Sequence, residues 1–190
     1  MPKNILQSEL AADVLARHAQ VTDDVEASLR GWSEEQLNWK PAPKSWSAGE
    51  CLRHLIVTHD AYWPNVQPRI GSTAARATEG GRVTSTWFGG MLLGYVEPGR
   101  KKKVKAPGVF APARSNVPGD VLDAFLRCHA TLGTTIENTQ DLDWHRVRVA
   151  TPVSRLIRLR LGDVYNILVT HAQRHVNQAK ALKGRDGFPA

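Results

Sequence analysis

Apolar side chains recur at intervals of three and four residues in four separate segments, and this pattern restricts the fold more than any other feature. The segments are 8–31, 119–138, 163–183 and a stretch that starts at Ser47 and continues until Pro64 or Pro68 interrupts it. Such spacing puts the apolar residues on one face of a helix, and that face must pack against another element. We therefore predict an all-α fold, an antiparallel four-helix bundle whose site residues point inward from facing helices.

The connections between these helices are unequal in length. Residues 64–118, a long crossover between the second and third helices, are rich in glycine, proline and small polar residues, with one short helix expected around STWFGGMLLGYV. We expect this crossover to cover or shape a site, because long connections in compact domains are usually functional. Residues 147–161 alternate apolar and polar positions, and this alternation fits two structures equally well: a small β-hairpin or an early start of the last helix.

Composition is that of an ordinary globular protein. The 190 residues are 42% hydrophobic and 23% charged, which disfavours disordered and membrane classes and suits a single domain over residues 1–190. We expect a cytoplasmic protein with no membrane segment, because no apolar run is long enough for a span and the N-terminus lacks a secretory signal. Cys51 and Cys128 are expected to be reduced thiols, with a disulfide between them as the alternative.

The net charge of +7 raises the question of an anionic partner. Much of the excess lies in Gly99–Lys105 and Ser154–Arg160, and neither run is interleaved with aromatic residues. Solvated loop faces explain such runs better than a nucleic-acid site does, so nucleic acid is not the partner that we expect. A non-catalytic bundle that binds an anionic partner such as nucleic acid is the alternative to an enzyme. The run from Arg100 to Lys105 could also attract a carboxylate of a substrate or a thiol cofactor.

The last helix carries two histidines and a glutamine on its inward face. His171, His175 and Gln178 continue the apolar stripe of that helix. Histidines at i and i+4 can hold one ion, because their Cβ atoms lie about 6 Å apart on one face. Burial favours a metal as well, since an ion would satisfy ring nitrogens that otherwise need partners. The metalloprotease motif H-E-x-x-H is excluded, because Ala172 stands where its glutamate would be.

A third ligand is needed, and His54 on the second helix is the best candidate. It lies at the edge of the apolar face, where a pocket could reach it. His18 and His129 also occupy inward positions, but a core histidine with hydrogen-bond partners is the more common outcome there. We expect His59 and His145 to be structural or exposed.

Glu50 and Gln178 are the candidate catalytic residues. Glu50 lies one turn before His54 and could accept its second ring NH or act as a base. The alternative for Glu50 is a capping box with Ser47, a form that Ser33–Gln36 also has. Gln178 lies one turn beyond His175 and is a candidate for the same role there.

Two stretches resemble the DinB-like (DinB/YfiT) superfamily of metalloenzymes. They are KPAPKSWSAGECLRHLI, residues 40–56, and LVTHAQRHVNQA, residues 168–179. The resemblance implies an antiparallel four-helix bundle, often dimeric, in which three histidines near one end hold a divalent ion. By position in the motifs, these ligands are His54, His171 and His175. The family includes transferases and isomerases that depend on a low-molecular-weight thiol.

The expected cofactor is a divalent metal ion, zinc or nickel first, although iron and manganese also accept imidazole. Three neutral nitrogen ligands leave one position open, and the ion lowers the pKa of a water or thiol bound there. We therefore expect a metal-dependent enzyme on a small-molecule substrate, either a thiol S-transferase or a hydrolase, in a homodimer. A degenerate bundle whose histidines are only hydrogen bonded is the alternative.

Overall fold

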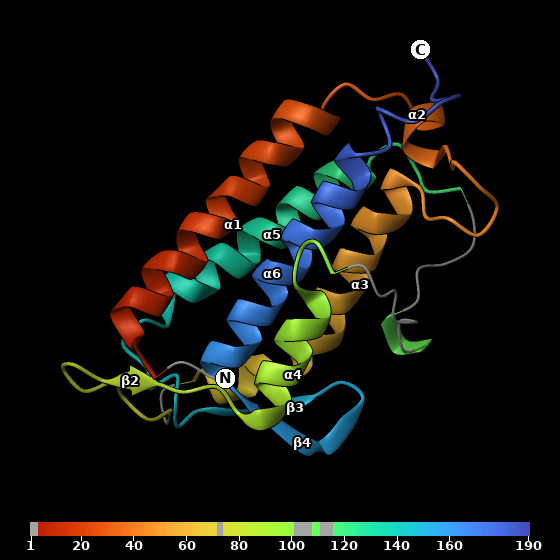
Figure 1. Ribbon diagram of the computed structural model, residues 1–190. Helices are drawn as coiled ribbons and strands as arrows, with labels where there is room; N and C mark the ends of the chain where they lie inside the picture. Colours follow the sequence, from red (N-terminus) through yellow and green to blue (C-terminus); the bar gives the residue numbers. More distant parts are fainter. Residues whose placement is uncertain (1–3, 72–73, 101–107, 111–115) are drawn as a thin grey trace.

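Four long helices run side by side and form the body of the molecule (Figure 1). They are α1 (Gln7–Leu29), α3 (Ala48–Val66), α5 (Val121–Asn138) and α6 (Leu161–Lys180). This computed structural model describes residues 4–71, 74–100, 108–110 and 116–190. The predicted four-helix bundle is confirmed, and every expected helix end lies within a few residues of the observed one.

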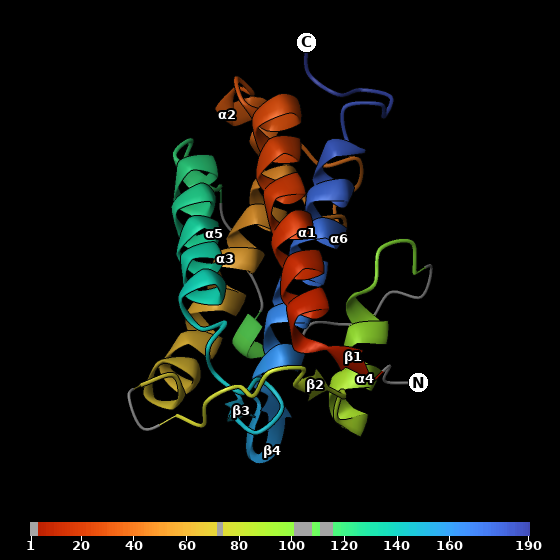
Figure 2. The same cartoon turned by 90° about the vertical axis from the view of Figure 1, so that its left-hand side faces the viewer.

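The long crossover sets the directions of the four helices. α1 and α6 run one way, whereas α3 and α5 run the other way (Figures 1 and 2). Each of α1 and α3 packs against both α5 and α6. The α1–α5 and α3–α6 pairs are therefore antiparallel, and the α1–α6 and α3–α5 pairs are parallel. This order requires the chain to return along the whole bundle between α3 and α5, which the 64–118 crossover is long enough to do.

The core consists of two apolar clusters, one toward each end of the bundle. The first contains the start of α1 and α6 and the end of α3 and α5, with Trp144 and Ile136 fully buried. The second contains the opposite ends of these helices, with Leu52 and Val176 fully buried. Histidines lie on all four helices at the boundary between the clusters: His18, His59, His129 and His171.

A β-hairpin covers the end of the bundle where α6 begins (Figures 1 and 2). Strands β3 (Arg148–Thr151) and β4 (Ser154–Arg160) pair antiparallel, with Val149 opposite Leu159. Both of these side chains are fully buried, which explains the apolar and polar alternation in the sequence. Of the two alternatives left open by the sequence, the hairpin is the one that forms, and α6 begins only after it, at Leu161.

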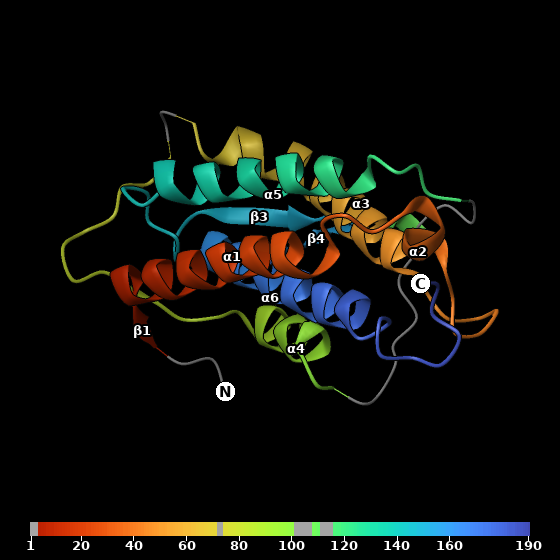
Figure 3. The same cartoon turned by 90° about the horizontal axis from the view of Figure 1, so that it is seen from above.

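The described parts of the crossover form several short elements. These are η1 (Gln67–Arg69), β2 (Arg82–Val83), which pairs with β1 (Ile5–Leu6), α4 (Trp87–Val96) and η2 (Gly108–Phe110). The short helix expected in this stretch is α4, and it packs on the outer side of α6 (Figure 3). Asp163 joins the two helices, because its Oδ2 accepts bonds from the Thr86 amide at 3.0 Å and the Thr86 hydroxyl at 2.9 Å.

Both predicted capping boxes are present. Ser33 starts α2 (Glu34–Asn38) with Gln36 as its partner, and Ser47 starts α3 with Glu50 as its partner.

Cys51 and Cys128 are free thiols, as expected from their spacing. Within the described residues, no helix combines the length and the apolar character that crossing a membrane requires.

Candidate metal site

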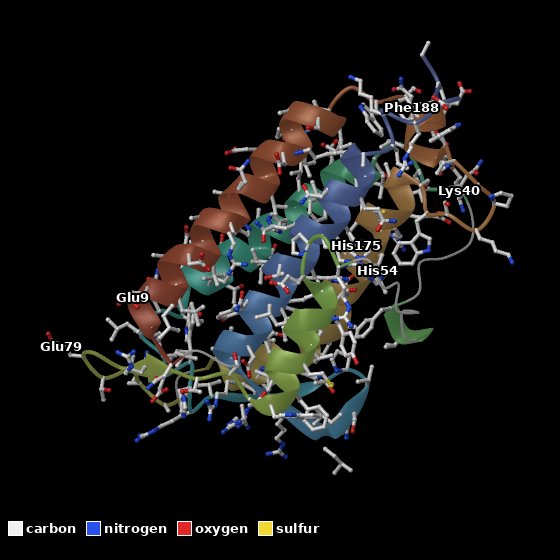
Figure 4. The ribbon with its side chains drawn as sticks, in the orientation of Figure 1. Glu9, Lys40, His54, Glu79, His175 and Phe188 are labelled. Carbon is white, nitrogen blue, oxygen red and sulfur yellow. The ribbon has the colours of Figure 1, made fainter. Side chains whose placement is uncertain are left out.

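Three histidines meet between α3 and α6. His54 comes from the first half of α3, and His171 and His175 come from the second half of α6, which runs antiparallel to it. All three are buried. The Nε2 atoms of His54 and His171 are 3.1 Å apart, and the ring centroids of the three pairs lie 4.6–4.8 Å apart. Figure 4 shows His54 and His175 close together between the two helices.

The cluster has the donor set and the spacing of a metal site. One ring nitrogen from each histidine lies within 4.8 Å of the others. Two imidazole nitrogens bound tetrahedrally to one zinc ion, each at 2.0–2.1 Å from it, are about 3.3 Å apart. The 3.1 Å separation of the His54 and His171 nitrogens is close to this value. In addition, the buried Nδ1 of His175 has no hydrogen-bond partner among the described residues. The residues present therefore fit a divalent ion.

The ring of His54 is oriented by the crossover. Its Nδ1 lies 2.5 Å from the carbonyl oxygen of Phe110 in η2, so Nδ1 carries the proton and donates it. The lone pair of His54 is then on Nε2, which faces His171. A carbonyl acceptor on the far nitrogen is the usual arrangement for a histidine that binds a metal. The crossover therefore helps to shape the site, as expected, through the Phe110 carbonyl.

The surroundings keep these imidazoles neutral. Burial lowers the pKa of His171 well below its usual value, and the neighbouring His175 and His54 add to the effect. Burial, with His54 and the Arg174 charge, lowers the pKa of His175 to about 3. Burial lowers the pKa of His54 too, against the opposing Phe110 bond. Neutral imidazole is the form that binds a metal, so the ligands need not lose protons near neutral pH.

Glu50 is buried next to this site but is engaged elsewhere. Its Oε2 accepts from the Ser47 amide at 2.9 Å, and its Oε1 accepts from Lys40 Nζ at 2.6 Å. The second ring nitrogen of His54 bonds to Phe110 rather than to Glu50. The capping role is thus established by its contacts, whereas the role of a base stays a prediction.

Gln178 is exposed, one turn beyond His175 on α6, so the expectation that it faces inward with the two histidines was wrong. It lies close enough to His175 to oppose the lowering of that pKa by burial, although it does not satisfy the buried Nδ1. Its catalytic role also stays a prediction.

Trp46 forms a wall of the cluster. Its ring stacks on His175 at a centroid distance of 5.4 Å and meets His54 edge-on at 4.9 Å. Trp39 contacts Phe188 near the C-terminus. Trp87 projects from α4 with 72% of its surface exposed.

His18 and His129 form a separate pair and do not join the three-histidine cluster. Their rings stack at a centroid distance of 3.8 Å, and each Nε2 bonds to the backbone carbonyl of the other residue, at 2.8 and 3.1 Å. Both are thus hydrogen-bonded residues, as expected, with His129 buried and His18 half-buried. His145 is half-buried beside the hairpin, where its Nδ1 accepts from the Thr84 amide.

Arg174 and Phe110 are site residues that the sequence pattern did not indicate. Arg174 donates to the carbonyl oxygens of Glu97 at 2.7 Å and Arg100 at 3.4 Å, and so connects the end of α4 to α6 beside the histidines. Of the basic run Arg100–Lys105, only Arg100 is within the described residues. It donates to the Gly94 carbonyl and lies over the Tyr95 ring. The only sequence feature that could have indicated Arg174 is its position directly before His175 in the last helix.

Comparisons with known proteins agree with this fold. Residues 17–179 match the model of the DinB superfamily. The chain is 26% identical over 156 residues to the uncharacterized protein YuaE of Bacillus subtilis (strain 168), covering 82% of this chain and 88% of that protein. In three dimensions it resembles YfiT from Bacillus subtilis, a probable metal-dependent hydrolase with an unusual four-helix bundle topology. That match has a TM-score of 0.58 and 13% identity, and it covers 100% of this chain and 94% of the other. Because the family match spans most of its length, this chain belongs to the DinB superfamily.

Proposed function

We propose that this protein is a metal-dependent enzyme that acts on a small molecule, with His54, His171 and His175 as the ligands of one divalent ion. The observation that carries the proposal is the convergence of three buried, neutral imidazoles from two facing helices. A bundle stabilised only by packing would gain from apolar side chains at these positions, because buried polar groups without partners are costly.

Hydrolysis is the reaction that we place first. The structural neighbour YfiT is described as a probable metal-dependent hydrolase, which supports this choice over thiol S-transfer. Bound at three histidines, a zinc-class ion supplies a Lewis acid and lowers the pKa of a water or thiol at its open position. A low-molecular-weight thiol as cosubstrate is the second candidate, since a metal site of this kind activates thiols as well.

The surrounding residues fix the ligands and limit the access of water. The Phe110 carbonyl holds the His54 ring with its Nε2 lone pair toward His171. Trp46 covers His54 and His175 on one side. The Arg174 charge beside the imidazoles favours an anionic substrate group and disfavours protonated ligands.

The test is an activity screen on protein purified without an affinity tag and loaded with zinc or nickel. Ester and amide substrates are assayed with and without a low-molecular-weight thiol. We expect metal-dependent turnover without thiol, and its loss in His171→Ala. The matched control is His145→Ala, which removes a histidine beside the hairpin and should retain activity. Turnover that requires the thiol would identify a transferase instead. Turnover that survives in metal-free His171→Ala would contradict the proposal.

A further inference from the structure

A second group of metal-ligating side chains lies between α3 and α5. It consists of His59 and Asp60 on α3 and Cys128 on α5, whose ligand atoms all lie within 4.8 Å of one another. α3 and α5 pack directly against each other and run parallel (Figure 3). None of these three side chains belongs to the cluster of His54, His171 and His175.

The ring nitrogens of His59 are buried without hydrogen-bond partners among the described residues. The residue is nine-tenths buried, with a relative exposure of 9%, and one face of its ring stacks on Trp63 at a centroid distance of 5.3 Å. Burial lowers the pKa of His59 and so favours its neutral form, which has one NH and one nitrogen lone pair. Leaving both unmatched costs about 1–3 kcal/mol for each group. A ligand at this ring would remove part of that cost.

The nearby groups can supply the rest of a coordination shell. The Asp60 carboxylate is 3.7 Å from His59 Nδ1, and 69% of that side chain is exposed. Cys128 is half-buried, so an ion has a route from solvent past these two residues. Burial, together with the Asp60 charge, raises the pKa of the Cys128 thiol to about 12, which keeps it protonated in the absence of a cation. A divalent ion between the two groups would reverse the effect of Asp60 and favour the thiolate.

We propose that His59, Asp60 and Cys128 form a second metal site, separate from the three-histidine cluster, which binds a zinc-class divalent ion and joins α3 to α5. A thiolate and an imidazole select zinc or cobalt over magnesium or calcium, which prefer oxygen ligands. One thiolate and one carboxylate also neutralise the two positive charges of the ion, so the filled site carries no net charge into a half-buried position. On binding, the thiol proton of Cys128 is released to solvent.

A buried water is the competing occupant. A cavity of about 20 Å³, lined in part by His59, Cys128, His129 and His171, lies at this point in the bundle. That volume is enough for one water molecule, which could bond to one nitrogen of His59. A water would leave Cys128 as a thiol, whereas a metal ion requires the thiolate. The state of the sulfur therefore distinguishes the two occupants.

Cobalt(II) added to the full-length protein gives the direct test. Thiolate bound to cobalt(II) produces a charge-transfer band in the near ultraviolet, and the three-histidine cluster, which has only nitrogen ligands, cannot produce it. We expect the band in wild-type protein, its loss in Cys128→Ser, and its retention in the matched control Cys51→Ala, whose sulfur is fully buried in the core. A His54→Ala/His171→Ala double variant should retain the band. Adding zinc should abolish it by displacing cobalt.

Alkylation provides a test that needs no variant. Cys51 is fully buried, so a thiol reagent reaches Cys128 first. We expect zinc at about ten times its dissociation constant to slow the alkylation of Cys128 by about tenfold, because only the metal-free fraction reacts. Absence of the cobalt band in folded wild-type protein, or alkylation at an unchanged rate in excess zinc, would overturn the second site and favour the buried water. Loss of the band in Cys51→Ala but not in Cys128→Ser would also overturn it.

Discussion

The Nε2 atoms of His54 and His171 face each other at 3.1 Å across the interface of α3 and α6. His54 donates through Nδ1 to Phe110, so its Nε2 presents a lone pair to its neighbour. The two antiparallel helices thus bring the Nε2 of His54 next to the histidine pair of the last helix.

A divalent ion should stabilise the folded chain. An ion that binds only the folded state adds about 2.7 kcal/mol at one hundred times its dissociation constant. We predict that zinc raises the melting temperature of Cys128→Ser protein, in which only the three-histidine site remains, and that His175→Ala in this background removes the increase. His145→Ala in the same background should keep it. Differential scanning calorimetry with and without chelator measures the shift, and an equal shift in the His175→Ala protein would refute its role as a ligand.

Buried His129 should make the stability of the fold depend on pH. Burial, together with His18, lowers the pKa of His129 from 6.5 to about 3 in the folded state. Between these values the unfolded chain binds a proton that the folded chain does not, so the free energy of unfolding falls as the pH falls from about 6.5 to about 3. One such group contributes at most about 1.4 kcal/mol per pH unit.

Urea unfolding over this pH range measures the effect of His129. The His129→Gln variant should lose less stability with acid than the wild type does, because its side chain does not titrate. Some loss should remain, because other buried histidines such as His59 still contribute. Parallel pH curves for the two proteins would show that His129 is not the titrating group.

Two variants distinguish the two possible roles of Glu50, as a helix cap and as a general base. Glu50→Gln removes the charge but keeps an oxygen for the Ser47 amide, whereas Ser47→Ala removes the capping hydroxyl and leaves the carboxylate. Because both Glu50 oxygens are engaged, we predict that each variant lowers the free energy of unfolding, by about 0.5–2 kcal/mol for Ser47→Ala. We also expect metal-loaded turnover to stay near the wild-type rate in both. A loss of about 10²-fold or more in Glu50→Gln alone would identify a general base.

Adjacent glycines in α4 should respond in opposite ways to alanine. A Cβ at Gly89 would collide with the Asp163 carboxylate, while nothing lies within 4 Å of a Cβ at Gly90. Gly89→Ala should therefore lower the free energy of unfolding by about 1–3 kcal/mol, because Asp163 must move away from Thr86. Gly90→Ala should raise it by up to about 1 kcal/mol, since alanine favours the helix. Equal effects in denaturant unfolding would mean that the close approach of α4 to Asp163 does not constrain the fold.

Periodicity was enough to predict the helices and the inward orientation of the three clustered histidines. His171 and His175 follow the apolar stripe of α6, and His54 lies at the edge of the one on α3, so their positions on a helix face are local properties of the sequence. The hairpin was only one of two alternatives, because the alternation of Val149 and Leu159 with polar residues did not exclude an early start of the last helix.

What the sequence could not supply depends on contacts between distant segments. The Phe110 carbonyl is a backbone atom, so no side-chain pattern marks it as the partner of His54. The parallel packing of α3 and α5 depends on the course of the crossover, and only this packing brings Cys128 near His59. His59 itself was expected to be structural or exposed; it is buried, but the lack of partners for its nitrogens emerges only in three dimensions.

Metal content tests the three-histidine site most directly. Cys128→Ser protein, purified without an affinity tag and resupplied with zinc or nickel, is analysed for metal alongside the same protein carrying His171→Ala or His145→Ala. We predict a near-stoichiometric amount of one divalent metal that is lost with His171→Ala and kept with His145→Ala. A folded Cys128→Ser protein that takes up no metal, or that holds as much with His171→Ala as without it, would contradict the site.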